Sequence, residues 1–194
     1  MNKLNIAKTM LIATALSFTA LAAQAAEYKG IVGIGLDFGG DVLKSGLYTN
    51  GSTWEVKANQ GLTFNGGMVM VNGVHETQAT IGYKFGGPQA KNGSVTWDTI
   101  PVELIQFYRT GIVRAGLGFV YQINPKLVVD IPGTSQTINY DNSLGLVAQV
   151  GWAPADMPIS IDLRLTAIKY KEKNVSGAKD ISGGTLGIYS SYYF

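Results

Sequence analysis

The chain of 194 residues contains no cysteine, only one histidine, and few charged side chains, which make up 14% of it. Without cysteine it has no lipoprotein anchor, no thiolate metal site and no disulfide. A lone histidine, His75, is also a poor basis for a metal centre. An exported protein of this size must then be held together by a packed core or by a closed sheet.

Long apolar runs are also missing. After residue 26 no apolar run approaches the roughly 20 residues that a membrane-spanning helix needs. In residues 1–26, Lys3 and Lys8 precede an apolar run from Thr9 to Ala23. Ala23-Gln24-Ala25 then follows a small-x-small pattern. These features are typical of a cleaved secretory signal peptide over residues 1–26, and the alternative is a genuine N-terminal helix. They predict one mature domain, residues 27–194.

An excess of either charge is absent from that mature domain. Removing residues 1–26 removes two lysines and no acids, which leaves 13 basic and 13 acidic side chains. A neutral chain without basic stripes gives no indication of a nucleic-acid partner. An exported chain without a spanning helix has three destinations: the periplasm, the exterior, or an outer membrane that it crosses with strands.

What the chain does have is alternation. Polar and apolar residues alternate with a period of two through most of the mature domain, alongside 25 glycines and 10 tyrosines. This period predicts half-buried strands rather than helices. Eight strands are expected, at 28–38, 53–71, 76–85, 97–109, 113–123, 140–152, 159–167 and 184–194. The fold class is therefore all-β.

The connections between these strands alternate between short and long. We expect short turns at Asn72-Gly73, Thr110-Gly111 and 153–158, and long loops near 40–52, 88–96, 125–139 and 172–183. The short turns would pair Val71 with Val74, Arg109 with Ile112 and Trp152 with Ile159, and each pairing brings polar faces together. Irregular backbone is expected near Gly39-Gly40 and near Pro101.

The polarity of the two faces indicates which one is outside. Aromatic residues stand near the ends of the apolar face, for example Tyr28 and Phe38 on the first strand. The opposite face mixes glycine with charges and amides, which suits a narrow, filled interior. Both features favour a barrel that turns its apolar face to lipid. A lipocalin-like soluble barrel, with the apolar face inside, is the alternative.

Several segments resemble a known group. They are the signal peptide, Gly-Leu-Thr-Phe-Asn-Gly-Gly at 61–67, Ile-Gly-Tyr-Lys-Phe at 81–85, and the terminal strand 185–194. Together they resemble the small eight-stranded outer-membrane barrels of the OmpA/OmpX type, over the whole mature chain. The resemblance implies an antiparallel up-and-down transmembrane barrel in a bacterial outer membrane, and a monomer. One departure is Tyr189, where the terminal strand of this group often has glycine.

The resemblance also implies a partner during biogenesis. The terminal strand of such barrels is read by the outer-membrane assembly machinery, and Ile188, Tyr192 and Phe194 are the residues expected to carry that signal here.

Four charges fall on inward positions of the predicted strands, namely Glu103, Arg114, Asp162 and Arg164. Because a lumen of eight strands is narrow, we expect an interior ion network, with Glu103 and Arg164 meeting across it. A structural plug is the preferred interpretation, and a polar conduit or gate is the alternative. Placing Glu103 inside leaves Gln106 facing outward.

No catalytic residue and no cofactor is predicted. A hydrolase would need a serine beside His75, and none follows it closely. At the outer end, Lys169, Lys171 and Lys173 are candidates for contact with lipopolysaccharide phosphates, and Lys84 and Lys91 flank another outer loop. Ordinary solvated loop charge is the competing interpretation.

The sequence therefore favours a non-enzymatic structural or surface-interaction component of a Gram-negative envelope, in contact with outer-membrane lipids and lipopolysaccharide. A narrow channel for small or hydrophobic solutes is the second hypothesis. An enzyme that modifies envelope lipids is the third.

Overall fold

The computed structural model describes residues 26–47, 51–90 and 93–194, so the predicted signal peptide lies outside the described residues except for Ala26. The strands in chain order are β1 (Glu27–Gly39), β2 (Val42–Leu47), β3 (Thr53–Lys57), β4 (Gly61–Asn72), β5 (His75–Gly86), β6 (Gln89–Ala90), β7 (Gly93–Thr110), β8 (Val113–Ile131), β9 (Thr134–Asn139), β10 (Ser143–Trp152), β11 (Ile159–Ala167), β12 (Lys169–Tyr170), β13 (Ile181–Ser182) and β14 (Thr185–Tyr193).

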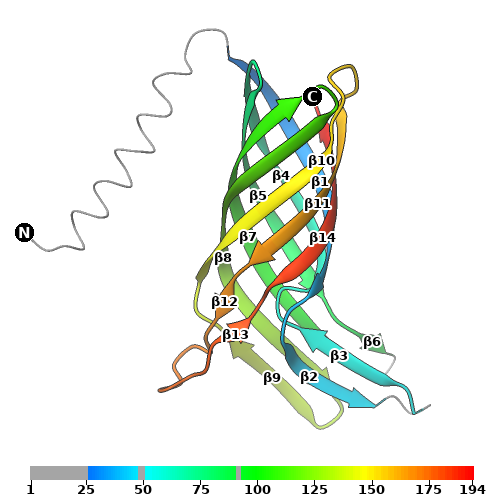
Figure 1. The fold of residues 1–194 in the computed structure, drawn as a ribbon. Helices are drawn as coiled ribbons and strands as arrows, with labels where there is room; N and C mark the ends of the chain where they lie inside the picture. Colours follow the sequence, from blue (N-terminus) through cyan, green and yellow to red (C-terminus); the bar gives the residue numbers. More distant parts are fainter. Residues whose placement is uncertain (1–25, 48–50, 91–92) are drawn as a thin grey trace, which may run out of the picture.

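Within the described residues, eight of these strands form a closed ring in the order β1-β4-β5-β7-β8-β10-β11-β14, with β14 paired back to β1 (Figure 1). Every pair of neighbouring strands in the ring is antiparallel. The predicted all-β, eight-stranded, up-and-down antiparallel barrel is confirmed.

The barrel has two unlike ends. The turns β4–β5, β7–β8 and β10–β11 lie at one end, together with the start of β1 and the last residue of the chain (Figure 1). We name this end the short-turn end. The hairpin β2–β3, the paired ends of β7 and β8, and strand β9 project from the opposite end, which we name the long-hairpin end.

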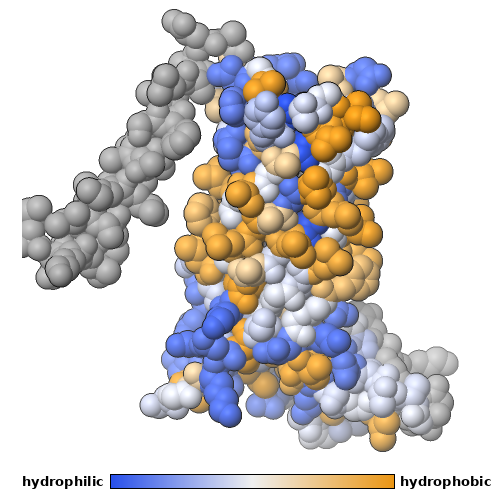
Figure 2. Space-filling model, in the orientation of Figure 1, coloured by the Kyte–Doolittle hydropathy of each residue, from blue (hydrophilic) through white to orange (hydrophobic). Residues whose placement is uncertain are grey.

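The outer wall is apolar over its middle. Large hydrophobic side chains point outward from all eight strands, and Figure 2 shows them as a belt between two polar rims. Leu117, Leu146 and Leu165 are 71%, 59% and 60% exposed. Inward positions alternate with them and are buried, as the predicted faces required.

The short turns lie one residue later than predicted. Asn72 pairs with His75 and Thr110 with Val113, so Gly73 and Gly111 are the first central residues of their turns, with φ of 58° and 57°. A type II′ turn needs glycine at that first position, whereas the prediction assumed glycine in the second. Trp152 likewise pairs with Ile161 rather than Ile159. Each partner moves by two residues along its strand, so the faces are unchanged.

The predicted strand 53–71 is wrong in its extent, because it is two strands. β3 ends at Lys57 and pairs with β2, and β4 begins at Gly61. The chain turns between them at Asn59, whose φ of 63° is left-handed. The irregularity expected near Gly39-Gly40 is present, since both glycines have positive φ.

The predicted loops near 88–96 and 125–139 are also wrong, because much of each segment is strand. β7 begins at Gly93, β8 runs on to Ile131, and β9 pairs with β8 through Asn139. Leu127 and Val129 lie on the buried face of this extension, and their burial stabilises it beyond the barrel wall. The irregularity expected near Pro101 is a register shift between Asp98 and Ile100.

An apolar cluster unites the long-hairpin end. Trp97 is fully buried, and its ring centroid lies 5.2 Å from that of Tyr140 and 5.0 Å from that of Tyr170. Val56 of β3 and Leu127 of β8 belong to the same cluster. Side chains from hairpins far apart in the sequence therefore pack together at this end of the barrel.

A glycine on β1 tests the packing of the interior. A Cβ on Gly35 would lie 2.2 Å from the ring of Tyr189, its direct partner on β14, whereas a Cβ on the outward Gly66 would have its nearest neighbour at 3.6 Å. We expect G35A to destabilise the barrel by ~1–3 kcal/mol through overpacking. The urea concentration at which the folded band disappears in unboiled gels measures this. G66A is the matched control, and an equal loss in both variants would contradict the packing argument.

Candidate functional site

The lumen contains the greatest concentration of charge in the described part of the chain. Inward positions of five barrel strands place charged side chains in two groups, one near the short-turn end and one near the middle. We name them the short-turn cluster (Glu76, Arg109, Arg114, Ser160, Asp162, Tyr193) and the central cluster (Asp37, Asn59, Lys84, Glu103, Gln149, Arg164, Tyr189).

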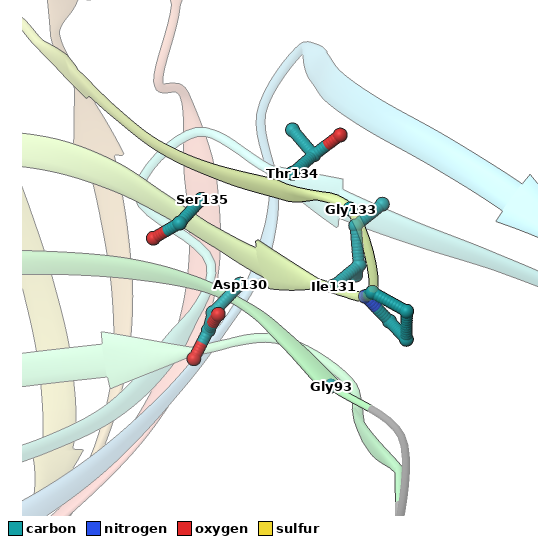
Figure 3. Close-up of a pocket in the computed structure, with 7 residues that line it drawn as sticks. Gly93, Asp130, Ile131, Gly133, Thr134 and Ser135 are labelled. Carbon is teal, nitrogen blue, oxygen red and sulfur yellow. The ribbon is translucent and has the colours of Figure 1, made fainter.

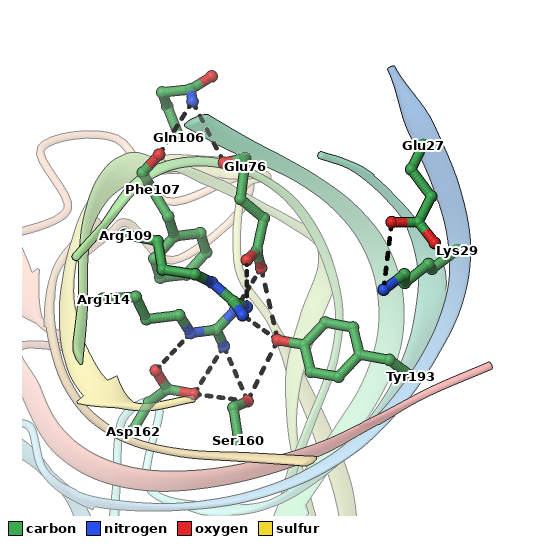
Figure 4. Close-up of polar contacts among 10 residues, drawn as sticks. All are labelled: Glu27, Lys29, Glu76, Gln106, Phe107, Arg109, Arg114, Ser160, Asp162 and Tyr193. Carbon is green, nitrogen blue, oxygen red and sulfur yellow. Dashed lines mark hydrogen bonds and ion pairs between the residues drawn. The ribbon is translucent and has the colours of Figure 1, made fainter. Parts of the chain in front are cut away.

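The guanidinium of Arg114, which is fully buried, is the centre of the short-turn cluster (Figure 4). Its Nε donates to Oδ1 of Asp162 at 2.9 Å and its Nη2 to Oδ2 at 2.7 Å, a bidentate pair. Nη2 also donates to Ser160 Oγ at 2.9 Å, and Nη1 contacts both Glu76 and Tyr193. Every side of the cation is occupied.

Glu76 joins two arginines that face one another across the β7–β8 hairpin. Arg109 and Arg114 are direct partners in the register, which would place two like charges side by side. Glu76 accepts from Arg109 Nη2 at 2.7 Å with one carboxylate oxygen and contacts Arg114 with the other. The two arginines are tolerated together because this carboxylate lies between them.

Arg164 organises the central cluster. Its Nη1 and Nη2 donate to the two carboxylate oxygens of Glu103 at 2.6 and 2.9 Å, and its Nε donates to Gln149 Oε1 at 3.0 Å. Its Cζ lies 3.7 Å from the ring centroid of Tyr189, a close cation–π contact.

Tyr189 connects this pair to a second one. Its hydroxyl donates to Asp37 Oδ2 at 2.5 Å, and Lys84 Nζ lies 2.7 Å from the same oxygen. Lys84 also donates to Asn59 Oδ1 at 2.9 Å. Gly35 on the neighbouring strand provides the space for the ring of Tyr189.

The four predicted interior charges all face inward and all are paired, but they lie in different clusters. Glu103 and Arg164 meet across the lumen in the central cluster, and Arg114 and Asp162 belong to the short-turn cluster. Gln106 faces outward as expected and is satisfied by Thr77, whose hydroxyl donates to it at 2.6 Å.

Sequence reasoning missed Asp37, Glu76 and Arg109, and it interpreted Lys84 as a lysine that flanks an outer loop and could reach lipopolysaccharide phosphates. That interpretation of Lys84 is wrong, since its side chain is 3% exposed and pairs with Asp37 inside the barrel. The available signal was parity, because Asp37 shares the inward face of Gly33 and Gly35, and Lys84 shares that of Gln78. Lys91 lies outside the described residues.

Not every buried polar atom in the lumen has a protein partner. Thr63 Oγ1, Asn65 Oδ1 and Gln78 Oε1, all on the β4–β5 wall, make no hydrogen bond within the described structure. Gly67 and Gly82 are their neighbours on the same wall. The three oxygens give this side of the lumen unused hydrogen-bonding capacity.

His75 lies at the short-turn end, opposite Asn72, and its ring packs edge-on to Tyr108 at 5.8 Å. In residues 26–47, 51–90 and 93–194, no group of three potential metal ligands occurs. The same part of the chain has no helix long and apolar enough to cross a membrane.

Two hollows of the described surface lie at the long-hairpin end. The larger of these two, of about 570 Å³, lies at the β8–β9 tip and is lined by Gly93 and residues 130–135, with Asp130 among them (Figure 3). The smaller, of about 230 Å³, is lined by Lys169, Lys171, Asp180 and residues 141–144. Lys173, the third predicted basic contact, does not line it.

The terminal strand completes the ring. Ile188, Tyr192 and Phe194 point outward and are 53%, 50% and 70% exposed. Phe194 also exchanges two backbone hydrogen bonds with Gly30, at 2.7 and 3.0 Å. The last residue therefore takes part in closing the sheet.

Neither a family model nor a curated protein matches the chain. Among solved structures, it is similar to the crystal structure of Neisserial surface protein A, NspA, with a TM-score of 0.50 and 14% sequence identity. The match covers 88% of this chain and 100% of that one. The likeness establishes a shared fold. At this identity it carries no residue of either cluster from one protein to the other.

The central cluster predicts a specific stability change. E103A leaves Arg164 buried without its carboxylate, which should destabilise the barrel by ~3–5 kcal/mol. The temperature at which the folded band is lost in gels would fall. Removing both charges, in E103L/R164M, should restore most of the loss because no uncompensated ion remains. If E103A left the transition unchanged, the plug interpretation would be wrong.

Proposed function

We propose that the protein is a monomeric, integral β-barrel of a bacterial outer membrane and acts as a non-enzymatic structural or surface-interaction component of the envelope. The observation that supports this most strongly is the reversed polarity of the barrel. Buried charges fill the inside, while the outside carries a continuous apolar belt.

That belt is too large for a protein surrounded by water. Monomeric soluble proteins rarely expose contiguous apolar patches above a few hundred Å², and here residues such as Leu117, Leu144 and Leu163 are more than half exposed on neighbouring strands. Lipid chains are the surroundings that this surface fits. A closed ring suits them as well, because unpaired backbone groups are costly in hydrocarbon.

Orientation follows from the unlike ends. Barrels of this kind place short turns toward the periplasm and longer loops outside the cell. On that basis the long-hairpin end would be the exterior face, and β2, β3 and β9 would be the parts available to other molecules. The outward residues Ile188, Tyr192 and Phe194 of β14 would present the signal for the assembly machinery.

The filled lumen supports a structural role over transport. The central cluster spans the lumen from β7 to β11, and the apolar cluster around Trp97 closes the long-hairpin end. The carboxylates of the central cluster, Asp37 and Glu103, form ion pairs and are not free for acid–base chemistry. This supports a non-enzymatic role.

A narrow channel is the second candidate. The unpartnered oxygens of Thr63, Asn65 and Gln78 favour it, since they give the lumen wall capacity for polar solutes. Conductance in planar bilayers separates the two functions. A closed barrel gives no single-channel steps, and reproducible steps that change in E103A would favour the channel.

Membrane insertion predicts that a leucine-to-lysine substitution lowers stability inside the apolar belt but not beyond it. Leu163, in the middle of the belt on β11, is 53% exposed, and Leu47, at the end of β2 beyond the belt, is 71% exposed. L163K should lower folding stability in lipid by ~2–4 kcal/mol, and L47K should be nearly neutral. Urea titration in lipid vesicles, followed by the shift between boiled and unboiled gel mobility, measures both. Equal tolerance of both lysines, with no mobility shift in the unsubstituted protein, would overturn the membrane assignment.

A further inference from the structure

Two lysines continue the outward row of β11 directly beyond the apolar belt. Along β11 and β12, residues at every second position face outward: Ile161, Leu163, Leu165 and Ala167, then Lys169 and Lys171. The lysine side chains are 71% and 61% exposed. The row therefore changes from apolar to cationic at the edge of the belt, on the wall rather than at the tip of a loop.

The hollow of about 230 Å³ lies at this transition. Its lining combines three kinds of surface, with Leu144 from the belt, the amide and hydroxyl of Asn142 and Ser143, and the ammonium groups of Lys169 and Lys171. Leu144 is 65% exposed, so one side of the hollow is continuous with the lipid-facing surface. The two acids of the lining are Asp141 and Asp180.

Asp180 holds both lysines toward the hollow. Its Oδ2 lies 3.2 Å from Lys169 Nζ and its Oδ1 lies 3.5 Å from Lys171 Nζ. The two ammonium groups lower the pKa of the Asp180 carboxyl, with the hydrogen bond from Lys169 as the main cause. Of the two acids that line the hollow, Asp180 is the one within ion-pair distance of these lysines, and both lysine side chains stay exposed to a stronger anion.

We propose that this hollow binds the phosphate group of an outer-leaflet lipid, with Lys169 and Lys171 on the phosphate and Leu144 against the acyl chains. The inference rests on the proposed outer-membrane location. A phosphate monoester carries a charge of about −1.5 to −2 and three acceptor oxygens, so it competes effectively with the single charge of Asp180. Asp180 keeps the lysines in place when no lipid is bound.

Other lysines of the same segment serve as controls. Lys173 and Lys179 are exposed in the loop between β12 and β13, and neither lines the hollow. The backbone N–H of Lys173 donates to the carbonyl oxygen of Asn139, a bond that does not use its side chain. K173Q/K179Q removes the same charge from the same loop as K169Q/K171Q.

The test is a titration of the full mature chain, folded in zwitterionic detergent, with diphosphorylated lipid A and with dephosphorylated lipid A, followed by native mass spectrometry. The unsubstituted protein should prefer the phosphorylated form. K169Q/K171Q should bind that form ~10-fold more weakly, because two charge-assisted contacts are lost, and the preference should fade at high salt. K173Q/K179Q should bind like the unsubstituted protein.

The direction in which D180N changes the affinity for the phosphorylated lipid decides between the two interpretations of Asp180. Since Asp180 competes with phosphate, its neutralisation should strengthen binding of the phosphorylated lipid, whereas a merely structural clasp would bind it no better after losing its carboxylate. An unchanged preference in K169Q/K171Q, or weaker binding in D180N, would overturn the site. Gel mobility before and after boiling is recorded for every variant. A normal shift with no lipid preference rejects the lipid site alone, and the absence of any shift in the unsubstituted protein rejects the membrane barrel as well.

Discussion

Closure of the ring is the constraint on which the rest of the structure depends. β1 pairs with β4 on one edge and with β14 on the other, and Phe194 adds its backbone to the last rung. Once the sheet is closed, no barrel strand keeps a free edge, and the wall can face an apolar medium. Closure also fixes an inside, which in a ring of eight strands is only wide enough for side chains.

That narrow inside explains why the charges are paired so completely. A carboxylate in the lumen has no room for bulk water, so an opposite charge must reach it from another strand. Arg114 of β8 reaches Asp162 and Glu76, and Arg164 of β11 reaches Glu103 on the far side of the ring. Glycine is the other half of the arrangement, since Gly35 leaves the volume that Tyr189 fills beneath Arg164.

The sequence predicted what depends on side-chain alternation and missed what depends on partners distant in the chain. The cost of a carboxylate facing lipid placed Glu103 inside, and parity then placed Gln106 outside, because a period of two is local. It placed these two turns one residue early, since Gly73 and Gly111 fit either central position until the pairing of the strands is known. Nor did it pair Asp37 with Lys84. These residues lie on β1 and β5, which are separated in the ring by β4, so their contact is visible only once the order of the strands is known.

The extended hairpins were missed for a related reason. Segments 93–96 and 126–131 look like loops by composition, yet each contributes to the apolar cluster around Trp97, and that burial is shared among strands far apart in sequence. The consequence is functional. The cluster packs apolar side chains at the end of the barrel where an open pore would need its mouth. The parts that remain accessible are the outer surfaces of the long-hairpin end and the edge of the belt, where Lys169 and Lys171 lie. The chemistry of this protein is therefore to be sought on its wall and its rim rather than in its lumen.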